Sequence, residues 1–385
     1  MKIAVLKETA AGETRCAVIP ETVKKFIALG ASVAVEAGAG MAASIADAEF
    51  EAAGATVGSR ADVLKGAGAI LCVDGPQASE LAGIEPGALL IGALDPLRRR
   101  EAIDSYAAAN LQALAMEWMP RITRAQSMDI LSSQSNLAGY KAVLEAAAAY
   151  GRAFPMMMTA AGTVSAAKVF VMGVGVAGLQ AIATARRLGA QVSATDVRSA
   201  TREQIQSLGA KPIFVENVAG IEGEGKGGYA GEMSDEYKAA QAELVSGHIA
   251  KQDIVITTAL IPGRPAPRLI SDAQLATMRS GSVVVDLAAD AGGNVEGCVV
   301  GQSVQRHGVT LIGASNLARS LAADSSALYA RNLYNFLNAF WDKEAAAPVL
   351  PDQDEIVKGV RLTAGGKVVH ERLAAEAATD ERRGA

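Results

Sequence analysis

The sequence predicts an α/β protein with two Rossmann-like domains, mainly parallel sheets and a cleft between the domains. Short apolar runs alternate with helical patterns, a glycine-rich turn joins one such run to a helix, and aromatic residues make up only 4% of the 385 residues. Alternating strands and helices are typical of parallel sheets that carry helices on both faces. A chain of this length predicts two or three domains.

The predicted elements place the first domain at 1–128 plus 316–385 and the second at 129–315. Toward the N-terminus, strands are expected at 3–6, 33–36, 69–73, 89–94 and 111–116, and helices at 21–29, 46–53, 61–65 and 99–108. Later segments predict helices over 136–150 and 316–340, strands at 169–172, 192–195, 213–215, 254–257, 283–286 and 310–312, and a hairpin over 356–370 with Gly365 and Gly366 in its turn.

Residues 168–196 have the full pattern of a dinucleotide-binding βαβ unit. Gly173 allows a tight turn after the apolar run, Gly175 lets backbone amides approach a pyrophosphate, and Gly178 lets the helix over about 176–188 pack on its strand. Asp196 ends the second strand, where a carboxylate accepts hydrogen bonds from both ribose hydroxyls and repels a 2′-phosphate. The pattern therefore predicts NAD rather than NADP. A glycine-rich turn without a ligand is the alternative.

Composition argues against several other classes. The formal net charge is −5 and no basic stripe is visible, which disfavours nucleic acid as a partner. No apolar run reaches the 18 to 20 residues of a membrane span, and the N-terminus lacks a signal-peptide pattern, so a soluble cytoplasmic protein is expected. Three cysteines and three histidines show no ligand spacing, so no metal site is expected.

Two segments predict features beyond the sheets. The apolar hairpin over 155–164 (PMMMTAAGTV) suggests a homodimer interface, with a buried contact between domains as the alternative. The segment 218–231 has six glycines in fourteen residues, which favours a mobile lid in which Tyr229 could swing onto a ligand. A disordered connector is the alternative for this segment.

The polar stretch over 117–136 (EWMPRITRAQSMDILSSQSN) interrupts the alternation and is either a solvated linker or a ligand-contacting loop. Between Lys65 and Lys141 the chain contains neither Lys nor His. Oxidation of an alcohol or amine needs such a group to move a proton, whereas hydride exchange between two nicotinamides needs none. Their absence favours the exchange reaction.

At these residues the chain resembles a known family, the NAD(H)-binding domain I of proton-translocating nicotinamide nucleotide transhydrogenase. The resemblance spans nearly the whole chain and is most specific in MPRITRAQSMDILSSQSN, with further matches in FPMMMTAAGTV, FVMGVGVAGLQAIATARRLGA, GGYAGEM and ITTALIPGRPAP. The sequence is also similar to alanine dehydrogenase at Arg15 and in the cofactor domain. It lacks the Lys and His that would hold and protonate a keto acid, and Asp74 stands where that Lys is expected.

The resemblance implies roles for individual residues. The polar loop would hold the nicotinamide, and the residues implied in catalysis are Arg121, Gln126, Asp129, Ser132 and Tyr229. The residues implied in cofactor binding are Arg124, Gln126, Gly173, Val174, Gly175, Val176, Gly178, Asp196, Val197, Arg198, Gly228, Gln241 and Leu260. Gln and Ser can hold a carboxamide, while Arg and Asp can tune charge as the ring becomes cationic.

The resemblance also implies a function. This chain would bind NAD(H) and exchange hydride with NADP(H) on a partner. The partners would be the transhydrogenase subunits of the inner membrane, namely the second portion of a split alpha subunit and the beta subunit. The reaction would be of the Re/Si-specific, proton-translocating type, with this chain on the cytoplasmic side. A stand-alone alanine dehydrogenase and a non-catalytic NAD-sensing module are the alternatives.

Overall fold

The computed structural model describes residues 1–215, 234–261 and 264–374 of the chain. They form two compact units, Met1–Gln134 with Arg319–Ala385, and Ser135–Ala318. The predicted domain limits differ from these units by a few residues at each boundary. The first boundary falls inside a helix, α5 (Ile130–Ala149), so no loop marks the change of unit there.

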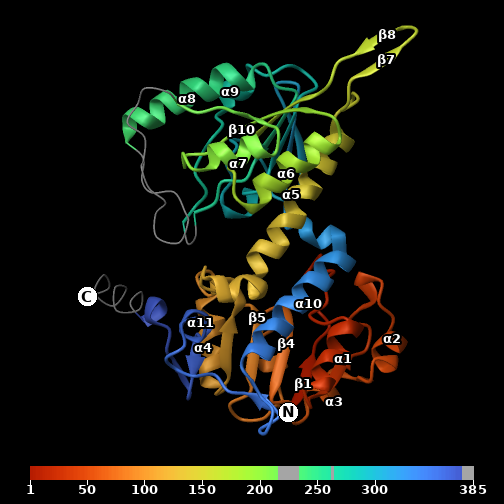
Figure 1. Ribbon diagram of the computed structural model, residues 1–385. Helices are drawn as coiled ribbons and strands as arrows, with labels where there is room; N and C mark the ends of the chain where they lie inside the picture. The colour runs from red at the N-terminus through yellow and green to blue at the C-terminus, as the bar shows by residue number, and fades with distance from the viewer. Residues whose placement is uncertain (216–233, 262–263, 375–385) are drawn as a thin grey trace. The chain divides into compact units, whose positions relative to one another are not determined.

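The first unit contains a six-stranded sheet in the order β3-β2-β1-β4-β5-β6 (Figure 1). Every strand pair in it is parallel. Because β1 and β4 are neighbours while the chain runs outward from each, the strand order reverses between them. The strands are β1 (Lys2–Val5), β2 (Ser32–Glu36), β3 (Thr56–Gly58), β4 (Ala69–Asp74), β5 (Leu89–Ala93) and β6 (Gln112–Ala115).

The strands of this sheet are apolar at consecutive positions, and consecutive side chains point to opposite faces. Both faces of the sheet are therefore buried. Ile3 and Val5 belong to a core that includes residues of α1 and α10, whereas Ala4 belongs to a second core with residues of α3 and α4. The helices of the unit are α1 (Pro20–Ala28), α2 (Asp47–Ala52), α3 (Arg60–Leu64), α4 (Arg100–Ala108), α10 (Ala322–Ala339) and α11 (Glu355–Val360).

The second unit contains a seven-stranded sheet in the order β11-β10-β9-β12-β13-β15-β14 (Figure 1). Only β14 is antiparallel to its neighbour. The two sheets confirm the predicted α/β class with mainly parallel strands. The strands are β9 (Lys168–Met172), β10 (Gln191–Thr195), β11 (Lys211–Pro212), β12 (Ile254–Thr257), β13 (Val283–Asp286), β14 (Ser303–Arg306) and β15 (Val309–Gly313).

Helices also cover both faces of the second sheet. Val169 and Val171 belong to a core with residues of α5 and α6, and Phe170 belongs to a core with residues of α8 and α9. A Cβ at Gly139 of α5 would lie 2.1 Å from the carbonyl oxygen of Ala177, so these two helices cross at backbone distance. The further helices are α6 (Val176–Arg187), α7 (Thr201–Ser207), α8 (Asp235–Ile249) and α9 (Asp272–Leu275).

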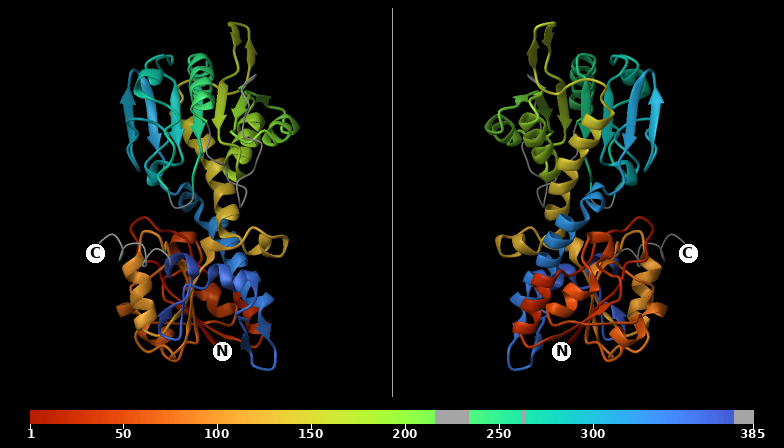
Figure 2. Two further views of the ribbon diagram at one scale, coloured as in Figure 1. Left: turned by 90° about the vertical axis from the view of Figure 1, so that its left-hand side faces the viewer. Right: turned by 90° about the vertical axis from the view of Figure 1, so that its right-hand side faces the viewer.

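The remaining elements are short. The strands β7 (Met157–Thr159) and β8 (Gly162–Val164) form the predicted apolar hairpin, which extends away from the rest of its unit (Figure 2). No helix within the described residues is long and apolar enough to cross a bilayer. The other short pieces are η1 (Met41–Ala43), η2 (Ala78–Glu80), η3 (Met116–Trp118), η4 (Thr123–Met128), η5 (Ala289–Ala291), η6 (Leu317–Leu321), β16 (Trp341–Asp342), β17 (Ala347–Pro348), β18 (Thr363–Ala364) and β19 (Lys367–Val368).

Several predicted boundaries were wrong. The hairpin expected over 356–370 is confined to β18 and β19, around Gly365 and Gly366, because the side chain of Asp354 caps the helix α11 through the amide of Ile356. The helix expected from residue 136 begins at Ile130. The strand expected at 213–215 lies at 211–212, and β3 and β14 were not predicted because they are short or exposed. The glycine-rich segment 218–231 lies outside the described residues.

Candidate functional site

The glycine turn after β9 has the geometry that its sequence predicts. Gly173 has a φ of +98°, and a Cβ at this residue would lie 2.6 Å from Oγ1 of Thr258. The hydroxyl of Thr258 donates to the carbonyl oxygen of Gly173 at 3.0 Å, which holds the turn against the end of β12. Any side chain at residue 173 would therefore strain the backbone and displace this hydrogen bond.

The next two glycines have different roles: Gly178 allows close packing, and Gly175 leaves open space. A Cβ at Gly178 would lie 1.9 Å from the carbonyl oxygen of Gly173, so only glycine lets α6 pack this closely on the turn. Gly175 precedes α6 as its N-cap, and a Cβ there would meet nothing within 4 Å. Space is therefore open beside Gly175, just before the first amides of α6, which have no partner within the helix. Such a helix start is a site for a phosphate group. Val174 is buried and Val176 is exposed.

Asp196 lies directly after β10 and is 8% exposed. Its Oδ2 accepts from the amide of Val174 at 2.7 Å and from Nη2 of Arg198 at 3.0 Å. Its Oδ1 accepts from the amide and from Nε of Arg198, both at 2.9 Å. A carboxylate has about four lone-pair positions, and these contacts use them. A ribose could bind Asp196 only after the Arg198 side chain moves aside.

The other predicted residues of the second unit are spread over several elements. Val197 and Arg198 follow Asp196 and are half-buried, and Gln241 is half-buried in α8. Leu260 follows β12 and is 50% exposed. Because β9, β10 and β12 are parallel neighbours, the turn at Gly173, Asp196 and Leu260 share the carboxyl edge of one sheet. Gly228 and Tyr229 lie outside the described residues.

The polar loop is a 3₁₀ helix, η4, followed by the start of α5. Ala125 and Met128 are buried in the core of the first unit, while Arg121 and Gln126 are exposed. Asp129 accepts from the amide of Ser132 at 3.0 Å and from its hydroxyl at 2.6 Å. This is the pattern of an N-cap on α5. The structure thus joins Asp129 to Ser132 and presents Gln126 to solvent.

Arg124, which the resemblance implies in cofactor binding, forms an ion pair with Asp354. Its Nη2 lies 2.8 Å from both carboxylate oxygens of Asp354, the residue that caps α11. This pair ties the beginning of the polar loop to α11.

Three glutamates bridge strand ends at the carboxyl edge of the first sheet, a feature that the sequence did not predict. Glu36 accepts from the amide of Lys7, and Glu8 accepts from the amides of Val73 at 2.6 Å and Asp74 at 3.1 Å. At the other end of the row, Glu117 accepts from the amides of Leu94 at 2.8 Å and Asp95 at 2.6 Å. Burial is the largest influence on Glu8 and Glu117 and raises the pKa of each to about 7. The only sequence signal was an acidic residue at the end of an apolar strand or up to three residues beyond it.

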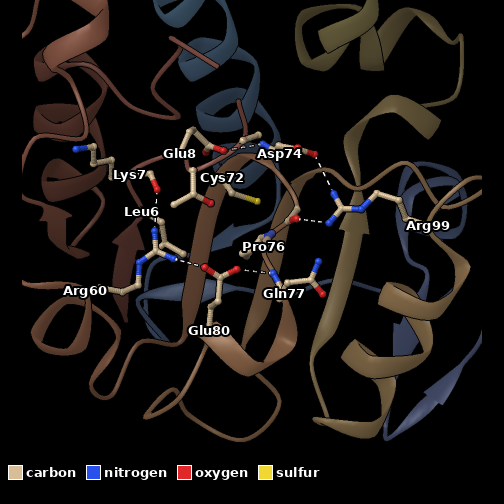
Figure 3. A pocket seen from close by; sticks show the side chains of 13 residues that line it. Leu6, Lys7, Glu8, Arg60, Cys72, Asp74, Pro76, Gln77, Glu80 and Arg99 are labelled. Carbon is tan, nitrogen blue, oxygen red and sulfur yellow. Dashed lines mark hydrogen bonds and ion pairs between the residues drawn. The ribbon is translucent and has the colours of Figure 1, made fainter. Parts of the chain in front are cut away.

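A pocket of about 190 Å³ opens where the strand order reverses, beside Glu8 and Cys72 (Figure 3). Two ion pairs lie among its charged side chains. Arg99 lies 3.0 Å from Asp74, and Arg60 lies 3.0 Å from Glu80. Burial raises the pKa of the Cys72 thiol well above its usual value, so this sulfur stays protonated.

Arg15 is held by groups of its own unit. Its Nε and Nη2 donate to the two oxygens of Glu13 at 2.7 and 2.8 Å, and its Nη1 donates to Gln134 at 2.9 Å. Glu13 also pairs with Arg319 at 3.1 Å. Arg15 as a whole is 8% exposed. Because Glu13 occupies its guanidinium, an incoming carboxylate would have to displace Glu13.

Among the described residues, no group of three or more His, Cys, Asp and Glu side chains is arranged to hold a metal ion. The second unit thus presents a glycine turn before a helix start, and the first unit presents a capped polar loop.

Comparison with known proteins gives the family. The protein-family model described as "Alanine dehydrogenase/PNT, N-terminal domain" matches residues 4–138. The family model described as "Alanine dehydrogenase/PNT, C-terminal domain" matches residues 142–371. The chain is 51% identical over 384 residues to the first portion of the split NAD(P) transhydrogenase subunit alpha of Rhodospirillum rubrum, a match that covers 98% of this chain and 100% of that protein.

Two further relatives are also similar to this chain. The crystal structure of transhydrogenase from Sinorhizobium meliloti aligns with a TM-score of 0.87 at 54% identity and covers 96% of this chain and 100% of that chain. Alanine dehydrogenase of Mycobacterium tuberculosis is 30% identical over 307 residues, which is 77% of this chain and 75% of that protein. The chain therefore belongs to the alanine dehydrogenase/PNT family and, within it, to the group of the NAD(P) transhydrogenase alpha subunits.

Proposed function

We propose that this chain is the NAD(H)-binding component of a proton-translocating transhydrogenase. The observation that carries the proposal is the turn from Gly173 to Gly178, in which the N-cap Gly175 is exposed and a Cβ on it would meet no atom within 4 Å. Close approach of a pyrophosphate to the first amides of α6 requires such space. The adenosine half of NAD(H) would bind along this edge, where Asp196 and Arg198 lie. The nicotinamide would be held by the polar loop, through Arg121, Gln126, Asp129 and Ser132.

The reaction would be a direct hydride exchange. Hydride leaves C4 of one reduced nicotinamide and joins C4 of the oxidised partner ring, so no proton has to be taken up or released at this site. NADP(H) would be bound by a separate subunit, in line with the naming of the relatives as an alpha subunit or a portion of one. The chain would act at the cytoplasmic face of the inner membrane through membrane-embedded partners, the second portion of the alpha subunit and the beta subunit. These partners would couple the exchange to proton movement.

A homodimer belongs to the same proposal. Met156, Met157 and Met158 of the apolar hairpin are 62%, 43% and 79% exposed. Three adjacent exposed methionines on a projecting hairpin form an apolar surface of the kind that a second copy can cover about a twofold axis.

Alanine dehydrogenase is the second candidate, and the first unit argues against it. A keto acid would need a free cation for its carboxylate and an acid for its keto group. Arg15 is engaged by both oxygens of Glu13, and Asp74, which pairs with Arg99, stands where the Lys of alanine dehydrogenase is expected. Incubation with NADH, pyruvate and ammonium should therefore leave NADH unconsumed, and steady NADH loss would overturn the transhydrogenase proposal.

The decisive experiment uses a purified NADP(H)-binding transhydrogenase domain. Mixed with this chain, NADPH and an oxidised NAD analogue that absorbs at its own wavelength, it should reduce the analogue. The same mixture without this chain is the control. If the analogue is not reduced, but the chain still binds NADH, the non-catalytic NAD-sensing module becomes the better description.

A further inference from the structure

Two asparagines on one face of α10 reach the polar loop. Nδ2 of Asn332 donates to the carbonyl oxygen of Ser127 at 2.8 Å, and Nδ2 of Asn335 donates to the same oxygen at 3.0 Å. Residues three apart on a helix face the same side, so both amides can reach one acceptor. A carbonyl oxygen has two lone pairs, so it can accept from both amides. The orientation of the peptide after Ser127 is therefore set by α10.

Asn332 also connects the loop to the helix that follows it. Its Oδ1 accepts from the hydroxyl of Ser133 at 2.7 Å, in the first turn of α5. Asn332 is 7% exposed, and a buried amide without partners would be costly, yet here both ends of the amide are bonded. One side chain thus links α10 to both ends of the segment that contains Asp129 and Ser132.

The contacts from α10 reach the loop where its own backbone bonding is long. A 3₁₀ helix has poorer hydrogen-bond geometry than an α-helix, and the bond from the amide of Asp129 to the carbonyl of Gln126 is 3.4 Å long. Ala125 and Met128 anchor one side of η4 in the core. At the other end, the ion pair of Arg124 with Asp354 is half-exposed on the arginine side, where such pairs contribute little.

We propose that Asn332 and Asn335 are positioning residues for hydride transfer. They hold the Ser127 peptide, and through it set the places of Gln126 on one side and Asp129 on the other, without touching the nicotinamide themselves. This inference rests on the proposed function, since it assigns the polar loop to the nicotinamide. Hydride transfer is sensitive to placement, because a misplacement of about 1 Å can cost on the order of a hundredfold in rate.

The test compares two substitutions on the same helix in the full chain. Asn335→Leu keeps the size of the side chain and removes the donor. Asn338→Leu changes an exposed asparagine near the end of α10, whose Oδ1 accepts from the hydroxyl of Tyr334 at 3.4 Å. Asn335→Gln keeps the amide and serves as the conservative variant. Asn335→Leu should slow hydride transfer from NADPH to an NAD analogue at least about tenfold, with the NADH dissociation constant within about twofold of the unsubstituted chain. Asn338→Leu should transfer hydride normally, and Asn335→Gln should recover some of the rate.

A second measurement does not depend on activity. Hydrogen–deuterium exchange of the segment 123–129 should be faster in Asn335→Leu and unchanged in Asn338→Leu, in the absence of any nucleotide. Unchanged exchange in Asn335→Leu would overturn the positioning role even if the unsubstituted chain transfers hydride. Faster exchange with a normal transfer rate would also overturn it. If the unsubstituted chain with its partner transfers no hydride at all, the proposed function fails instead, and the exchange data still report whether α10 holds the loop.

Discussion

The buried glutamates at the carboxyl edge of the first sheet make the stability of the first unit depend on pH. Glu8 and Glu117 each bridge to the end of a neighbouring strand, and burial raises the pKa of each from 4.5 to about 7 despite the amide donors that oppose it. The folded state therefore binds protons more tightly than the unfolded state. The resulting stability is complete below about pH 4.5 and is lost as the pH rises through about 7.

Replacing each carboxyl by an amide should remove its share of this dependence. A rise of the pKa from 4.5 to about 7 corresponds to about 3 kcal/mol per group. Between pH 4.5 and pH 8, the free energy of unfolding of the unsubstituted chain should fall. In Glu8→Gln or Glu117→Gln this fall should be about 3 kcal/mol smaller, and the double variant should combine the two effects. In Glu8 the two amides donate to different oxygens, so Glu8→Gln leaves one amide without its acceptor and loses about 1 to 3 kcal/mol of stability at every pH. In Glu117 both amides donate to Oε1, so Glu117→Gln can keep both bonds. The slope with pH is therefore the informative quantity.

Urea unfolding followed by tryptophan fluorescence can measure this slope. The chain has two tryptophans, Trp118 and Trp341, and both belong to the first unit, so the signal reports on the unit that contains the glutamates. Glu51→Gln, at an exposed position of α2, is the matched control and should keep the original slope. If Glu8→Gln and Glu117→Gln also keep the slope of the unsubstituted chain, the assignment of raised pKa values to these carboxyls is refuted.

Three further predictions concern the proposed function. Asp196→Ala should weaken NADH binding by about 1 to 3 kcal/mol in calorimetry and reduce discrimination against NADPH, and an unchanged NADH affinity would exclude Asp196 as the ribose ligand. Gln126→Asn or Asp129→Asn should slow hydride transfer in stopped flow while NADH binding stays nearly intact. A normal rate with a lowered melting temperature would instead give these residues a purely structural role, such as the N-cap that Asp129 forms on α5. Met158→Glu should convert the expected homodimer into a monomer in light scattering, whereas a monomer before substitution would contradict the dimer itself.

The α/β class and the glycine turn could be predicted from the sequence because both depend on residues close in the chain. A buried parallel strand is a short apolar run, and the roles of Gly173 and Gly178 follow from the turn between one strand and the next helix. The same locality explains the errors at element ends. The segment after Asp354 could be a strand or a helix by its apolar residues, and the capping bond to the amide of Ile356 decides for α11.

Contacts between distant segments of the chain were decided only by the tertiary structure. Glu8 meets the amide of Val73 because parallel strands bring their ends to one edge, and Ser127 meets Asn332 because α10 packs against η4. Asp196 was predicted from its place after a strand. Its ion pair with Arg198 depends on the side-chain conformations of both residues at the carboxyl edge of the second sheet. Hydrogen bonds require partners within about 3 Å and in line, and a linear pattern of residue types carries no information on such distances between segments far apart in the chain.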